Sequence, residues 1–162
     1  MTGPPAGDAI ANPIDSRNAT DEREWITATV GASGYRADVR AGPHSFIADE
    51  PIALGGTGLG PTPYELLLGA LSSCMAMTLR MYADRKGWPL QSVSIHLRTD
   101  RAHQKDCEQC ETNDVGPPRI ARRIELNGPL TDEQRTRLHQ IADRCPVKQT
   151  LERGVKVETE RG

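Results

Sequence analysis

Hydrophobic and polar positions alternate along the first part of the chain, and the alternation predicts short strands ahead of a long helix. β-branched and aromatic residues dominate 25–30, and alternating patterns return over 35–39 and 44–48. Glycine-containing turns separate the three runs. A period of two is the pattern of a half-buried strand, and short turns favour antiparallel pairing. We therefore expect these segments to form an antiparallel meander.

A capping signal then predicts where the long helix begins. Thr62 suits the N-cap, Pro63 the first helical position, and Glu65 the third position of a capping box. The helix is expected to run to about Arg85. Its first turns, residues 66–76, carry no charged side chain. A helix that is apolar on nearly every side is usually buried on nearly every side, so we expect it to be the central core helix.

The segment before this helix, residues 55–61, is rich in glycine. It does not match a phosphate-binding P-loop, because no Lys followed by Ser or Thr comes after its last glycine. We interpret it as a flexible loop that leads into the helix.

The second half of the chain predicts two more strands, two helices and a final strand. Alternating residues over 93–97 and 119–127 indicate strands, and capping or proline signals open helices at 131–143 and 146–153. Residues 155–158 alternate again and indicate a last strand. The expected order is βββ–α–ββ–αα–β, an α+β fold with an antiparallel sheet packed on helices.

Length and charge bound the classes of protein that remain. The chain has 162 residues, a net charge of -2 and a pI near 6.1, which do not suit a nucleic-acid-binding domain. Residues 1–22 are rich in Gly and Pro and are expected to be a flexible tail, and residues 23–162 one domain. We expect no membrane-spanning segment and no secretory signal. Four cysteines without such a signal favour a reducing, cytoplasmic location.

Two cysteines lie at positions that suit thiol chemistry. Cys74 lies in the middle of the apolar helix, where a free cysteine often only fills space. Cys145 directly precedes Pro146, which places it at the N-cap of the last helix. Backbone N–H groups and the helix dipole are expected to lower the pKa of a thiol there. A structural role for either cysteine stays open at this point.

Cys107 and Cys110 form a CxxC pair in a polar loop, with His103 four residues before it. Such a pair is either redox-active or half of a zinc site. A structural zinc site needs four ligands, and the sequence offers His103 as a third ligand but no evident fourth. We favour an exposed thiol pair over a metal site.

The run GPTPYELLLGALSSC over residues 60–74, followed by Cys145-Pro146-Val147, resembles the OsmC/Ohr family, the osmotically inducible and organic hydroperoxide resistance proteins. The resemblance extends over residues 25–158. It implies an OsmC-like fold in which the sheet wraps long central helices of a tightly intertwined homodimer. The Cys107–Cys110 loop resembles a subgroup in which the OsmC-like domain follows an α/β-hydrolase domain.

The resemblance also implies an activity, that of a two-cysteine peroxidase that uses no metal or other cofactor. Cys74 would attack an organic hydroperoxide or hydrogen peroxide and become a sulfenic acid. Cys145 would condense with it to a disulfide, and a dithiol such as a dihydrolipoyl group would reduce the pair. Glu65 and Arg36 are the expected catalytic carboxylate and cation, with Arg40 as the alternative cation.

The sequence departs from the family pattern at two places. Neither Arg36 nor Arg40 lies in a diagnostic motif for the arginine partner, and Tyr64 stands where the family has the glutamate, with Glu65 following it. One residue is about 100° around a helix, so Glu65 has a different direction. Two alternatives to the peroxidase therefore stay open: a non-catalytic module that binds a small ligand near Cys74, and a metal or redox sensor acting through His103, Cys107 and Cys110.

Overall fold

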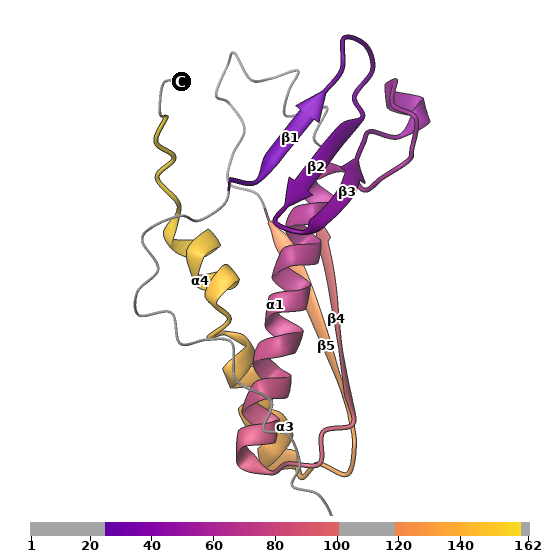
Figure 1. The fold of residues 1–162 in the computed structure, drawn as a ribbon. Helices are drawn as coiled ribbons and strands as arrows, with labels where there is room; N and C mark the ends of the chain where they lie inside the picture. Colours follow the sequence, from indigo (N-terminus) through magenta and orange to yellow (C-terminus); the bar gives the residue numbers. More distant parts are fainter. Residues whose placement is uncertain (1–24, 101–118, 160–162) are drawn as a thin grey trace, which may run out of the picture.

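The computed structural model describes residues 25–100 and 119–159. In this part of the chain, two antiparallel sheets and three α-helices follow the predicted α+β order except for its last strand (Figure 1). The predicted tail, residues 1–22, lies outside the described residues.

The N-terminal sheet is the predicted meander. Strands β1 (Thr27–Val30), β2 (Ala37–Ala41) and β3 (His44–Ala48) pair antiparallel in sequence order. Thr27 lies opposite Arg40, and Arg40 lies opposite Ser45. The sheet lies beyond the N-terminal end of the long helix α1 (Pro63–Lys86; Figure 1).

Hydrogen bonds to Asp49 hold the glycine-rich segment after β3 in place, which corrects the prediction of a flexible loop. The buried carboxylate of Asp49 accepts hydrogen bonds from the backbone N–H of Glu50 and from both the N–H and hydroxyl of Thr57. These bonds lower the pKa of Asp49 to about 2. At Gly60 a Cβ atom would clash with the carbonyl of Ile47, so the loop needs glycine for close backbone approach. A short 3-10 helix (η1, Ile52–Leu54) directly precedes this segment.

Helix α1 (Pro63–Lys86) begins at the predicted capping box. The Thr62 side chain accepts from the Glu65 N–H, and the Glu65 carboxylate accepts from the Thr62 N–H at 2.8 Å. The helix ends at Gly87, whose φ of 62° suits glycine.

The prediction that α1 is buried on nearly every side is wrong for a single chain. One stripe is buried, formed by Leu71, Met75, Leu79 and Ala83. The opposite face is exposed, and an 18-residue window of the helix is only 22% buried. By length and hydropathy alone α1 is also long enough to cross a membrane, a property that core helices of soluble proteins share. One chain supplies too few elements to cover both faces.

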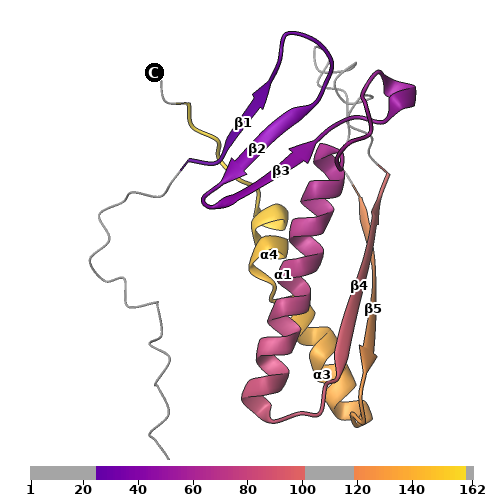
Figure 2. The same ribbon diagram turned by 45° about the vertical axis from the view of Figure 1, so that its right-hand side comes forward.

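The C-terminal half forms a long hairpin and two helices. Strands β4 (Ser92–Thr99) and β5 (Ile120–Asn127) pair antiparallel, and helices α3 (Asp132–Ala142) and α4 (Pro146–Arg153) follow. Helix α1 packs against β4, α3 and α4, and runs alongside the β4–β5 hairpin (Figure 2). This junction contains the main hydrophobic core, which holds Leu79, Leu138 and Cys145.

The predicted last strand is not formed. Residues 155–158 belong to no strand, and Val155 and Val157 are 65% and 86% exposed. A strand needs a neighbour to receive its backbone hydrogen bonds, and no strand of the described chain pairs with this segment.

Candidate functional site

Cys145 lies in the corner between α3 and α4, where two local signals place it. Helix α3 ends at Ala142, and Pro146 begins α4, so Cys145 is the N-cap residue of α4 as predicted. Its side chain is fully buried in the core. The backbone N–H groups of Val147 and Lys148 lie close enough to the thiol to act on its pKa, although none makes a capping hydrogen bond to Sγ.

The predicted fall in the pKa of Cys145 is wrong. Burial raises the pKa of this thiol, and this effect exceeds the lowering by the Lys148 and Val147 N–H groups. The neighbouring Cys74 side chain raises the pKa further, through a hydrogen bond and through its charge. The sequence showed that Cys145 lies at a helix N-terminus but not how deeply it is buried, so the largest contribution to its pKa was missed. At neutral pH Cys145 therefore stays a protonated thiol.

The structure brings Cys74 to this corner from the middle of α1. Cys74 is half-buried and packs against the core cluster that contains Cys145. The two side chains interact directly, and both thiols are free. The tertiary fold thus joins two cysteines that lie far apart in the sequence, as a peroxidatic and resolving pair requires. Their catalytic roles stay predictions.

A cavity of about 570 Å³ opens between α1, the β4–β5 hairpin and α4, and neither Cys74 nor Cys145 is among its lining residues. Most of its lining is apolar. The lining residues are Tyr64, Leu67, Leu68, Leu71, Met75, Leu97, Thr99, Ile120, Arg122, Lys148, Leu151 and Glu152. Met75 follows Cys74 in α1, and Lys148 lies in the first turn of α4 behind Cys145. The size is in the usual range for a small-molecule site.

A chain of charged side chains borders this cavity. Arg122 Nη2 lies 3.0 Å from Asp143 Oδ1, and Lys148 Nζ lies 3.6 Å from the same oxygen. Lys148 Nζ also lies 2.6 Å from Glu152 Oε1. Sequence reasoning pointed to Lys148 as a positive charge near Cys145 but missed Arg122, Asp143 and Glu152. Arg122 occupies an alternating strand position, and nothing in that pattern shows that its side chain reaches α1 and the α3–α4 corner.

The structure does not bring Glu65 to Cys74. The Glu65 carboxylate bonds to the backbone N–H and the hydroxyl of Thr62, at 2.8 and 3.0 Å. Glu65 also lies on the opposite side of α1, because nine residues at about 100° each leave a half-turn between it and Cys74. A catalytic role for Glu65 stays a prediction that one chain alone does not support.

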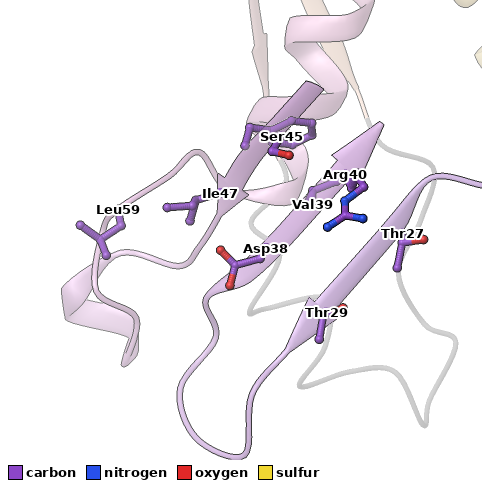
Figure 3. Close-up of a pocket in the computed structure, with 9 residues that line it drawn as sticks. Thr27, Thr29, Asp38, Val39, Arg40, Ser45, Ile47 and Leu59 are labelled. Atoms are coloured by element: carbon purple, nitrogen blue, oxygen red, sulfur yellow. The ribbon is translucent and has the colours of Figure 1, made fainter. Parts of the chain in front are cut away.

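The two candidate arginines lie on the N-terminal sheet. Arg36 pairs with Asp38 at 2.8 Å and is about half exposed. Arg40 lies on β2 at a second hollow, of about 750 Å³, with Thr27 and Thr29 on the neighbouring strand (Figure 3). No residue that lines this hollow belongs to α1 or α4. Among the described residues, Arg36 and Arg40 make no hydrogen bond or ion pair with Cys74 or Cys145, and the role of each stays a prediction.

The predicted metal or redox site falls outside the described residues, because His103, Cys107 and Cys110 lie between the described ranges 25–100 and 119–159. Among the residues of those ranges, no group of three or more His, Cys, Asp and Glu side chains is placed to hold a metal ion.

Comparison with known proteins identifies the fold family. The family model described as OsmC-like protein matches residues 56–160. An OsmC-like protein from Mycoplasma pneumoniae has a similar structure, with a TM-score of 0.64 and 20% identity over 82% of this chain and 89% of its own. No curated protein matches the sequence.

Two further similar structures are organic hydroperoxide resistance proteins. The organic hydroperoxide resistance protein OsmC from Legionella pneumophila has a TM-score of 0.57 and 20% identity, over 79% of this chain and 89% of its own. The one from Elizabethkingia anophelis has a TM-score of 0.51 and 18% identity, over 80% and 89%. At these identities the likeness establishes the fold.

Proposed function

Because the chain belongs to the OsmC-like protein family, we propose that it is a thiol peroxidase that reduces organic hydroperoxides, or hydrogen peroxide, through Cys74 and Cys145. The observation that carries the proposal is the direct interaction of these two thiols. Met75, which follows Cys74, and Lys148, three residues after Cys145, line an apolar cavity. The organic hydroperoxide resistance proteins among the similar structures support a peroxide-related role.

The reaction divides into an attack and a resolution step. The Cys74 thiolate attacks one peroxide oxygen, the O–O bond breaks, and the alcohol leaves with a proton while Cys74 becomes a sulfenic acid. Cys145 then forms an S–S bond to the Cys74 sulfur, and the hydroxyl leaves as water. A dithiol such as a dihydrolipoyl group reduces the disulfide by exchange, and both thiols are restored.

The raised pKa of Cys145 supports this division of roles. Only a thiolate attacks a peroxide efficiently, and burial keeps Cys145 protonated. A protonated Cys145 is protected from reacting with the peroxide itself. Its place against Cys74 suits it for the second step, in which the sulfenic acid needs a thiol close by.

We further propose that the active unit is a homodimer in the cytoplasm. The face of α1 that carries Met77 and Met81 is exposed, and so are Val30 and Phe46 of the N-terminal sheet. A second copy would cover these apolar side chains. Because Arg36 does not reach the thiols within one chain, we propose that the partner's sheet supplies the cation that assists Cys74.

Thiol mapping by mass spectrometry tests the peroxidase. After one equivalent of cumene hydroperoxide, the wild-type protein is expected to form the Cys74–Cys145 disulfide faster than a Cys107–Cys110 disulfide. Cys74→Ser should abolish turnover, and Cys145→Ser should allow one turnover before Cys74 overoxidises. Multiple turnovers by Cys74→Ser would refute the mechanism.

The apolar cavity also favours a second candidate, an OsmC-like module that binds a small ligand without turning it over. The same experiment separates the two. A Cys74 that stays reduced under excess hydroperoxide, with oxidation confined to Cys107 and Cys110, would favour the binding module.

A further inference from the structure

Arg122 is the cation best placed to act inside the apolar cavity. Its side chain leaves β5, lines the cavity and reaches Met75 on α1 and Asp143 at the end of α3. The side chain is only 28% exposed. A cation at this depth needs acceptors for its donors, because burying an unpaired charge is costly.

Among the described residues, one arm of the guanidinium has a poor partner. Nη2 is paired with Asp143 at 3.0 Å, whereas Nη1 contacts the thioether sulfur of Met75 at 3.8 Å. A thioether is a weak acceptor. A carboxylate that entered the cavity would offer Nη1 a charge-assisted bond in place of the sulfur contact, which is the stronger interaction.

At the cavity, the cationic side chains are more deeply buried than the acidic ones. The cations Arg122 and Lys148 are 28% and 24% exposed, whereas the acids Asp143 and Glu152 are 53% and 61% exposed. Arg122, Lys148 and Glu152 line the cavity, whereas Asp143 does not. An anion within the cavity would therefore meet two cations and one acid in the lining, which favours a negative head group.

We propose that this cavity binds an apolar molecule that ends in a carboxylate, with Arg122 as the anchor of the head group. The aliphatic body packs against Leu67, Leu71 and Leu97, which line the cavity. Binding of this kind does not depend on the peroxidase activity, so the two proposals fail separately.

Isothermal titration calorimetry of the full chain tests the site, with dodecanoate as the probe and dodecyltrimethylammonium as the control of equal chain length and opposite charge. We expect dodecanoate to bind about tenfold more tightly or better, the equivalent of one charge-assisted bond. Arg122→Met should remove that difference. Arg123→Met is the matched control, because the neighbouring strand position faces the other side of the sheet and is 75% exposed.

A second variant keeps the test decisive if Arg122→Met does not fold. Glu152→Gln removes one acid from the cavity lining and leaves Lys148 paired with Asp143 alone, so dodecanoate should bind more tightly and the cationic probe more weakly. Equal affinities of the two probes for the wild-type protein would overturn the proposal. So would undiminished dodecanoate binding by a folded Arg122→Met variant, or failure of the wild-type protein to bind dodecanoate.

Discussion

The exposed methionines of α1 give the sharpest test of the proposed dimer. Met77 and Met81 lie one turn apart and about half a turn from the buried stripe of the helix, and they are 64% and 63% exposed. The perturbation is the double variant Met77→Gln/Met81→Gln. Glutamine resembles methionine in length and helix propensity, so the fold of each chain should survive.

The expected effect follows from the exposed fractions. Full burial of a methionine side chain is worth about 1.5–3 kcal/mol, so covering two-thirds of one contributes about 1–2 kcal/mol. A symmetric dimer buries four such side chains, which gives about 4–8 kcal/mol. At about 1.4 kcal/mol for each factor of ten, the Kd of the dimer should rise at least about a thousandfold.

Sedimentation velocity over a series of protein concentrations measures this Kd. The wild-type protein should sediment as a dimer, and the double variant as a folded monomer at the same concentration. Lys86→Gln is the control, because it changes an exposed polar residue near the end of the same helix. A monomeric wild-type protein, or a double variant with an unchanged Kd, would refute the reasoning.

Three further predictions concern single residues. Glu65→Gln keeps the capping box with Thr62, since glutamine also serves there, so urea denaturation should show unchanged stability. A fall in peroxidase kcat with the fold intact would support catalysis by Glu65, and an unchanged kcat would exclude it. Cys145 has a raised pKa, so its contribution to stability is present below the pKa of the unfolded state and is lost as the pH rises through the pKa of the folded state. The free energy of unfolding should therefore decline above about pH 9, and Cys145→Ser should reduce that decline. Asp49 has a pKa lowered from 3.8 to about 2, so its contribution to stability is present above pH 3.8 and is lost as the pH falls towards 2. Asp49→Asn should remove this acid-dependent loss. If the free energy of unfolding falls identically with acid in both proteins, the role given to the hydrogen bonds of Asp49 is contradicted.

Local signals in the sequence were enough to place most elements of the fold. The capping box of Thr62 and Glu65 fixed the start of α1, because its hydrogen bonds join residues only three apart. Pro146 likewise placed Cys145 at an N-cap. Segment 155–158 has the alternation of a strand but forms none in one chain, since pairing depends on a partner that no local pattern supplies.

The candidate site was found from the sequence and the tertiary structure together. The sequence by itself selected Cys74 and Cys145, because the motif around the first and the proline after the second are local features. Only the tertiary structure decided that burial outweighs the helix N-terminus at Cys145, and that Arg122 reaches across from β5 to Met75. Both results depend on how deeply a side chain lies among elements distant in sequence, and desolvation and long-range contacts of that kind leave no mark on the local pattern of residues.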